Sequence, residues 1–148
     1  MQAMRWLRQL FKQRKSVSKA FLAGDVVNAF AKEQQRIKSA GSIEDEHYTD
    51  FVAQVKVLKR EKRHDEAISL LNQLVEATQA ESRAAGAGWG VAPWYYEQLA
   101  IIYRKERRYA DEVEILLRYN KQPKAPGAGL SKLAARLDKA RQLLAAES

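Results

Sequence analysis

The chain of 148 residues contains no cysteine, so it has neither disulfide bonds nor thiol-based metal or redox sites. This absence fits a reducing compartment, and we expect a cytoplasmic protein. No uninterrupted apolar run approaches the roughly 20 residues that a membrane-spanning helix needs. No apolar segment follows the basic N-terminus, so a secretory signal is not expected either.

Glycine and proline are also scarce, with 7 and 3 residues. Most glycines lie in Gly86–Gly90 and Gly127–Gly129, beside Pro93, Pro123 and Pro126. Runs of β-branched residues with a period of two are missing, so strands are not expected. The sequence therefore predicts an all-α fold. The first helix is expected at about 5–30 or beyond. It either continues unbroken or breaks near Gly24-Asp25, where Asp25 would cap a second piece that runs to residue 39. The other helices are expected at about 45–63, 65–84, 93–107, 110–119 and 130–146.

The sequence offers no arrangement of side chains that is typical of an active site. The two histidines, His47 and His64, lack the spacing of a metal site. The glycine-rich loop lacks the preceding strand and the following Lys-Ser/Thr of a phosphate-binding loop. No nucleophile can be paired with a general base, so we expect no enzyme, no cofactor and no metal. Glu44–His47 is better explained as a solvated helix start with acidic residues in its first turn than as a ligand cluster.

The net charge of +8 is unevenly distributed. Residues 1–20 hold six basic residues and no acidic ones, residues 121–148 carry a net charge of +4, and the middle of the chain is close to neutral. The N-terminal arm is amphipathic, and three roles stay open for it. It could lie on an anionic membrane, bind the phosphates of nucleic acid, or dock as a capping helix or on a partner protein. The residues of this basic arm are Arg5, Trp6, Arg8, Lys12, Arg14 and Lys15.

Two stretches of the chain, Val57–Leu71 and Ile102–Leu117, are similar at an offset of 45 residues. Each passes from a basic cluster through one ring, His64 or Tyr109, to an acidic pair and an apolar pattern. Such repetition is typical of a helical hairpin that stacks on its own copy. The matching apolar positions are Phe51 and Tyr96, Val55 and Ala100, Leu58 and Tyr103, Ile68 and Val113, Leu70 and Ile115, and Leu71 and Leu116.

Residues 48–121 resemble the tetratricopeptide repeat. The resemblance rests on Tyr96, Leu99, Ala100, Tyr103 and Tyr109 in the second unit, and on Phe51, Leu58, His64 and Ala67 in the first. The departures are Gln54, Val55 and Glu112 at positions where the family has leucine, a small residue and alanine, and a spacing longer than the usual 34 or so residues. The resemblance implies two stacked antiparallel hairpins at 43–122, a fragment of an α-solenoid. A helical arm at 1–42 and a linker with a capping helix at 123–148 would flank them.

The basic clusters Lys59–Arg63 and Arg104–Arg108 are expected to end the first helix of each hairpin. Cations there oppose the negative end of the helix dipole, and the acidic pairs that follow complement the positive end of the next helix. Contact with a ligand is the alternative role of these clusters. His64 is expected to be a turn residue that packs between helices, and Trp89 either folds back over its hairpin or stays exposed as a contact residue.

The resemblance implies that partners bind on the concave face of the first helices. That face would be mostly cationic with one large aromatic residue, which suits an acidic or C-terminal peptide. The residues of this predicted groove are Val52, Lys56, Lys59, Arg60, Trp94, Glu97, Ile101, Arg104 and Lys105. Val52 and Gln98 replace the asparagines of chaperone-binding relatives, so chaperone binding is not expected.

The sequence thus predicts a non-catalytic protein–protein interaction module or assembly subunit that binds an acidic segment of a partner protein. Self-association is a second way to complete so short a stack. The alternative is a nucleic-acid-binding accessory protein that uses the basic arm, although no known reading motif is present.

Overall fold

The structure is a computed structural model, and it describes residues 23–126 and 130–148. The chain divides into two units, Met1–Arg36 and Ile37–Ser148. Within the first unit, residues 23–36 are helical, and Val26, Val27 and Phe30 are 65–67% exposed. Gly24 and Asp25 lie inside this helix, so its described part contains no break at these two residues.

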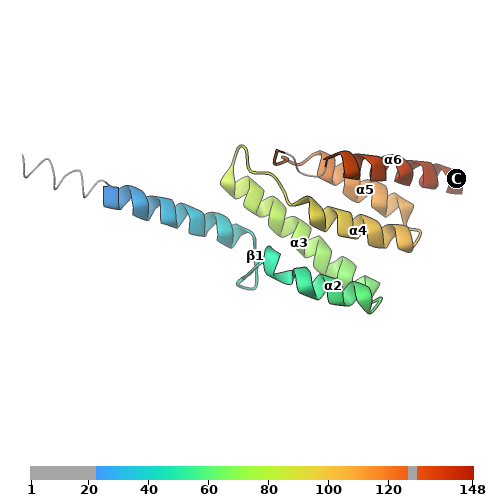
Figure 1. Cartoon of the computed structure of the whole chain (residues 1–148), viewed down its shortest axis with the longest axis horizontal. Coiled ribbons are helices and arrows are strands. Elements are labelled where there is room, and N and C mark those ends of the chain that lie inside the picture. The colour runs from blue at the N-terminus through green and yellow to red at the C-terminus, as the bar shows by residue number, and fades with distance from the viewer. Residues whose placement is uncertain (1–22, 127–129) are drawn as a thin grey trace, which may run out of the picture. The chain divides into compact units, whose positions relative to one another are not determined.

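The second unit confirms the all-α fold (Figure 1). None of the helices in the described ranges is long and apolar enough to cross a membrane. After helical residues 37–40, the elements are β1 (Ser42–Ile43), β2 (Glu46–His47), the 3-10 helix η1 (Tyr48–Phe51), α2 (Val52–Arg60), α3 (His64–Ala85), α4 (Pro93–Lys105), α5 (Tyr109–Asn120) and α6 (Leu130–Glu147).

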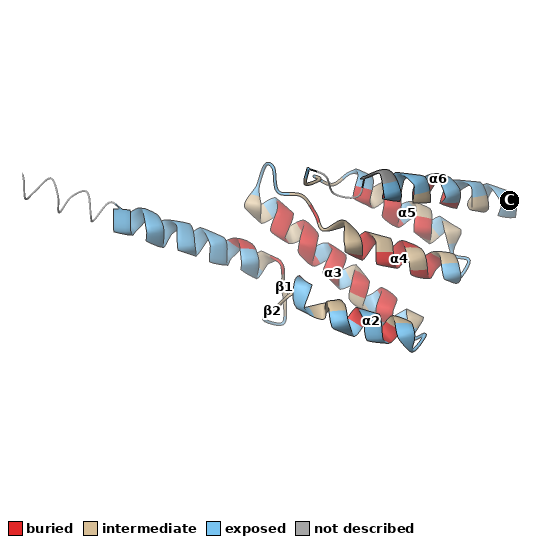
Figure 2. Cartoon of the chain, viewed as in Figure 1, coloured by how far each residue is buried: buried red, intermediate tan, exposed pale blue. Residues whose placement is uncertain are grey.

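Each helix from α2 to α6 packs on the next one in the chain. Buried residues follow the facing sides of α3, α4 and α5 (Figure 2), and Leu71, Leu74, Tyr96 and Leu99 are among the fully buried side chains. Burial of one such apolar side chain contributes about 1.5–3 kcal/mol to folding. The core therefore lies between consecutive helices, which is the arrangement that the helical periodicity predicts.

The loops between the hairpins pack against each other. The backbone N–H of Val91 donates to the carbonyl of Pro123 at 3.0 Å, and that of Ala92 donates to Thr78 Oγ1 at 2.9 Å. A Cβ atom at Gly90 would collide with the backbone of Lys124 and Ala125. Gly90 is therefore needed for close approach of two chain segments, and not for turn flexibility alone.

The expectation of no strands and of a helix from about residue 45 is wrong at residues 42–51. Strand β1 pairs with β2 in antiparallel register, Ser42 opposite His47 and Ile43 opposite Glu46. Glu44 and Asp45 form the two-residue turn with φ values of 48° and 70°. Two positive φ values suit the twist of a tight hairpin, and acidic residues do not reveal such a turn as Asn-Gly would. The α-helix consequently begins only at Val52.

Strand β1 packs on α3, and Tyr48, the first residue after the hairpin, contacts α4. The hydroxyl of Tyr95 donates to the carbonyl of Tyr48 at 3.2 Å, and the two rings meet edge to face. Burial raises the pKa of Tyr95 to about 12. The hairpin is thus fixed by residues distant in sequence, which local patterning cannot anticipate.

The sequence repeat is present in the backbone as a repeated turn. Lys62 and Arg107, which are 45 residues apart, both adopt left-handed backbone conformations with φ values of 56° and 58°. Each follows a first helix and completes a C-terminal capping motif in which two backbone N–H groups bond back into the last helical turn. The closing bonds are Arg63 N to Leu58 O at 2.9 Å and Arg108 N to Tyr103 O at 2.8 Å.

The expected placement of charge around these turns is confirmed. Lys59 and Arg60 lie in the last turn of α2, and Arg104 and Lys105 lie in the last turn of α4. The acidic pairs Asp65-Glu66 and Asp111-Glu112 lie in the first turns of α3 and α5. Each charge opposes the nearby end of its helix dipole.

Replacing Lys62 or Arg107 by glycine should stabilise the protein, because a left-handed conformation is costly for a residue with a Cβ atom. We expect Lys62→Gly and Arg107→Gly each to raise the free energy of unfolding by about 0.5–1 kcal/mol. Lys56→Gly, at an exposed position in the interior of α2, should instead lower it by about 1 kcal/mol. Urea denaturation measures all three, and a loss of stability in both turn variants would contradict the conformation described.

Candidate functional site

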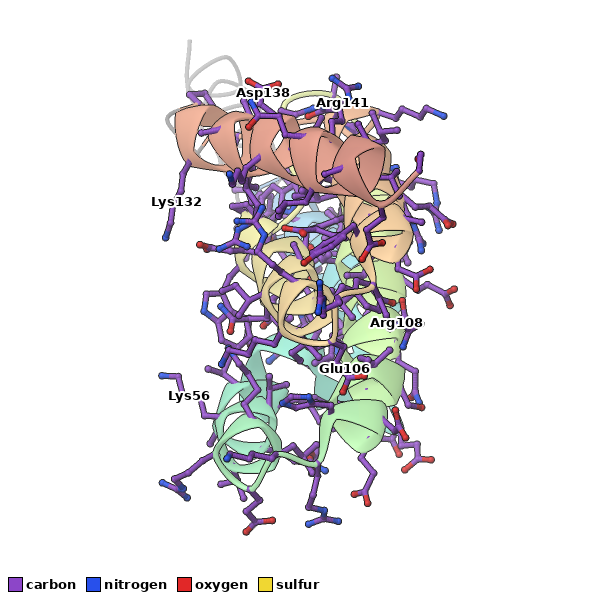
Figure 3. The ribbon with its side chains drawn as sticks, turned by 90° about the vertical axis from the view of Figure 1, so that its right-hand side faces the viewer. Lys56, Glu106, Arg108, Lys132, Asp138 and Arg141 are labelled. Carbon is purple, nitrogen blue, oxygen red and sulfur yellow. The ribbon has the colours of Figure 1, made fainter. Side chains whose placement is uncertain are left out.

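One face of the second unit gathers cationic side chains from three helices. We call it the inner face and define it by Lys56 and Lys59 of α2, Trp94, Glu97 and Lys105 of α4, and Lys132 and Arg136 of α6. Figure 3 shows Lys56 and Lys132 projecting to the same side of the unit, whereas Asp138 and Arg141 lie on the outer side of α6.

Hydrogen bonds and an ion pair link the three helices across the inner face. Lys59 Nζ of α2 donates to Gln98 Oε1 of α4. Lys132 Nζ of α6 lies 2.7 Å from Glu97 Oε1 of α4. Helix α6 therefore forms a wall of the face, a role that sequence reasoning did not assign to it.

The nine residues of the predicted groove fall into three groups. Those on the apolar floor are half-buried, and Trp94 also meets Tyr95 edge to face at 5.0 Å. Those that bond within the protein are also half-buried, and the remaining cations are exposed. The apolar floor is formed by Val52, Trp94 and Ile101. The residues that bond within the protein are Lys59, Glu97 and Arg104, and the exposed cations are Lys56, Arg60 and Lys105.

Lys59 lies at the centre of the positive charge. Burial lowers the pKa of its amine, and the nearby charges of Lys105 and Arg136 lower it further, while Glu97 opposes them. Cations from α2, α4 and α6 therefore sit close enough to repel one another. Of the residues that define the inner face, five are cationic and one, Glu97, is acidic, so positive charge predominates there.

Arg104 is turned toward a buried carboxylate. Glu112 of α5 has no exposed side-chain surface, and its Oε1 lies 2.8 Å from Arg104 Nη2 and 3.3 Å from Arg136 Nη1. Arg104 Nη2 also donates to the carbonyl of Arg136 at 2.9 Å. The cluster joins α4, α5 and α6, and it gives a physical reason for an acidic residue at a position where the resemblance implies alanine.

Sequence reasoning missed Arg136 and Lys132, although a signal was present. Glu112 stands where the resemblance implies alanine, and a carboxylate that is buried at such a position needs cationic partners, because an unpaired buried charge is very costly. Arg136 and Lys132 are spaced four residues apart, so they lie on the same side of α6. Only the fold shows that this side faces α4.

The histidines form separate polar contacts. The prediction of a helix start at Glu44–His47 is wrong, because His47 ends the hairpin and places Nε2 at 2.5 Å from Glu81 Oε2 and Nδ1 at 2.8 Å from Thr49 Oγ1. His64 was expected in the turn, but it is the first residue of α3, directly after the turn. Its Nδ1 lies 2.7 Å from Glu106 Oε1 at the end of α4. The described residues contain no group of three or more side chains that could hold a metal ion.

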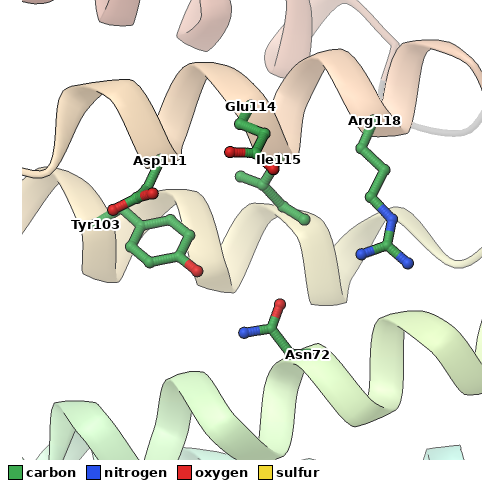
Figure 4. Close-up of a pocket in the computed structure, with 6 residues that line it drawn as sticks. All are labelled: Asn72, Tyr103, Asp111, Glu114, Ile115 and Arg118. Carbon is green, nitrogen blue, oxygen red and sulfur yellow. The ribbon is translucent and has the colours of Figure 1, made fainter.

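Trp89 and two hollows lie on other parts of the described surface. One hollow of about 400 Å³ opens along α5 and is lined by Ala110, Val113, Glu114, Leu117, Arg118 and Lys121. The indole of Trp89 is 45% exposed, so the structure shows the exposed alternative. A cavity of about 100 Å³ lies between α3, α4 and α5 and is lined by Asn72, Tyr103, Asp111, Glu114, Ile115 and Arg118 (Figure 4). It is smaller than the 300 Å³ or so that ligand pockets occupy. Arg118 is also engaged, donating to Gln79 Oε1 at 3.0 Å.

Removing the charge of Glu112 should destabilise the protein strongly. Glu112→Gln keeps the shape of the side chain but leaves Arg104 and Arg136 without their counter-ion, so we expect a loss of about 3–5 kcal/mol in the free energy of unfolding. Lys132→Gln removes an ion pair whose lysine is 72% exposed, and it should cost at most about 1 kcal/mol. Chemical denaturation of both variants measures these losses. Equal losses in the free energy of unfolding would show that the buried cluster stabilises the protein no more than the exposed ion pair does.

Comparison with known proteins does not supply a family. No protein-family model, curated protein or solved structure matches the chain. The resemblance to the tetratricopeptide repeat therefore stays a prediction from the sequence. Functional inference rests on the chain's own geometry and charge.

Proposed function

We propose that the chain is a non-catalytic protein–protein interaction module, or an assembly subunit, that binds an acidic segment of a partner protein on its inner face. The observation that supports this most is the convergence of Lys59, Lys105 and Arg136 from three helices. A partner's carboxylates would supply the negative charge that this face lacks.

The carboxylates already on this face are occupied. Glu97 is paired with Lys132, and Glu112 is enclosed by Arg104 and Arg136. Lys56 and Lys105 are exposed, and neither belongs to an ion pair found in the described part of the chain. These two lysines are the cations most available to an incoming acidic segment, and charge-assisted hydrogen bonds are the strong class of such contacts.

An apolar floor lies beside the cations. Val52, Trp94 and Ile101 are half-buried, so they expose part of their surface without leaving the core. An aromatic anchor surrounded by charged groups is a common arrangement at interfaces with a few dominant contacts. We therefore expect the bound segment to combine acidic residues with at least one apolar side chain.

The expected repeat architecture is part of the same proposal. In stacked hairpins of the tetratricopeptide type, the first helices line the binding face, which would correspond to α2 and α4. The repeated turns at Lys62 and Arg107 support this correspondence. Helix α6 would then extend the binding face in addition to capping the last hairpin.

Charge reversal on the inner face should weaken binding of an acidic peptide. We expect Lys56→Glu/Lys105→Glu to lower the affinity for a fluorescent Glu/Asp-rich peptide by about tenfold or more, since like charges would then meet. The variant avoids Lys59 and Arg104, whose bonds to Gln98 and Glu112 are structural. The matched control Lys121→Glu/Arg141→Glu makes the same charge change elsewhere on the surface and should bind normally. Fluorescence anisotropy measures both, and equal binding by the two variants would contradict the proposal.

Peptide binding should also raise the pKa of Lys59. In the free protein this pKa lies below the ordinary 10.5, because the amine is partly buried and faces Lys105 and Arg136. A bound carboxylate favours the charged amine, so affinity should fall as the pH rises through the pKa of the free protein. Titration of the lysine Cε resonances by NMR, with Lys59→Arg for assignment, measures this. An unchanged Lys59 titration beside a bound peptide would place the peptide elsewhere.

The nucleic-acid alternative depends on the basic arm, and Arg5, Trp6, Arg8, Lys12, Arg14 and Lys15 lie outside the described residues. A tagged pull-down from the native host, with and without nuclease, separates the two functions. A partner protein that is retained after nuclease treatment and is lost with Lys56→Glu/Lys105→Glu supports the inner face as the binding site. A partner that is lost after nuclease treatment and is still recovered with this variant supports nucleic-acid binding by the basic arm.

A further inference from the structure

The turn of the hairpin carries a concentrated negative charge. Glu44, Asp45 and Glu46 are consecutive and all exposed, and we call them the acidic tip. None of the three takes part in an ion pair found among the described residues. The tip is thus the same kind of acidic segment that the inner face is proposed to bind.

The acidic tip cannot reach the cations at the far end of its own helix α2. The tip precedes η1, whereas Lys59 lies in the last turn of α2. Lys59 lies eleven positions after Tyr48 along continuous 3-10 and α-helix, a rise of about 17 Å or more. Figure 1 shows the hairpin at one end of α2 and the turn into α3 at the other.

We propose that the inner face of one molecule binds the acidic tip of a second copy of the same chain. The inference rests on the proposed function, since it uses the same face and the same preference for carboxylates. Charge complementarity supports the choice of occupant, because the three exposed carboxylates match a face in which Lys56 and Lys105 have no partner in the described ion pairs.

The geometry of this contact sets the kind of assembly. The tip and the inner face are different surfaces, so the contact is heterologous and runs head to tail. An open assembly keeps one unused tip at one end and one unused face at the other. Further copies can therefore add to it, unless the rotation between copies closes a ring. Because the paired groups are exposed and the tip is small, the contact is weak and sensitive to salt.

Sedimentation velocity over a range of protein concentrations tests the proposal with two complementary variants. Glu44→Asn/Asp45→Gly removes two of the three negative charges of the tip and introduces the residues that a turn with two positive φ values prefers, so the hairpin stays folded. Lys56→Glu/Lys105→Glu reverses the charge of the two exposed lysines of the face. The wild type should associate as its concentration rises and dissociate in high salt, and each variant alone should associate at least about tenfold more weakly.

Mixing the two variants gives the decisive result. Each retains the surface that the other has lost, so one tip and one face remain compatible. The mixture should form a one-to-one heterodimer and nothing larger. The control Lys121→Glu/Arg141→Glu should associate as the wild type does.

Three results would overturn the inference. The wild type could stay monomeric throughout, either variant alone could associate as strongly as the wild type, or the mixture could fail to pair. The acidic-peptide assay on the same samples separates this failure from that of the proposed function. A monomeric wild type that binds the acidic peptide refutes self-docking alone. A monomeric wild type that does not bind the peptide refutes both self-docking and the proposed function.

Discussion

The buried carboxylate of Glu112 is the interaction on which the C-terminal half of the second unit depends. A charge inside a helical core is tolerable only when it is paired and hydrogen-bonded, and Arg104 and Arg136 supply that pairing from two other helices. The cluster thereby fixes how α4, α5 and α6 lie together. It also withdraws Arg104 from the surface, so the basic cluster at the end of α4 is partly structural.

The same packing produces the charge imbalance of the inner face. Helix α6 brings Lys132 and Arg136 toward α4, and in the described part of the chain their ion pairs are with Glu97 and with the enclosed Glu112. Lys59 is left close to Lys105 and Arg136, and the lowered pKa of its amine is the consequence. This excess of positive charge, together with the half-buried Trp94, is the basis of the proposed binding of acidic protein segments.

The acidic tip and the cations Lys59 and Lys105 lie on different parts of the second unit. The tip belongs to a turn with two positive φ values that precedes η1, whereas Lys59 lies in the last turn of α2 and Lys105 in the last turn of α4. In the proposed self-docking, this separation limits neutralisation of the tip within one molecule. The tip would then be available to the inner face of a neighbouring copy.

Helical periodicity, the clustered glycines and prolines, and the 45-residue repeat were enough to predict the all-α fold and a turn after each first helix, because these depend on local backbone preferences. The two helices end at Arg60 and Lys105, a few residues before the predicted ends at about 63 and 107. The groove residues on α2 and α4 followed from the same periodicity together with a family resemblance. Tertiary structure alone decided the hairpin at Glu44 and Asp45, since Tyr48 is held by Tyr95, a residue 47 positions away. It alone also decided that α6 faces α4, because the direction in which a helix packs depends on contacts between distant segments.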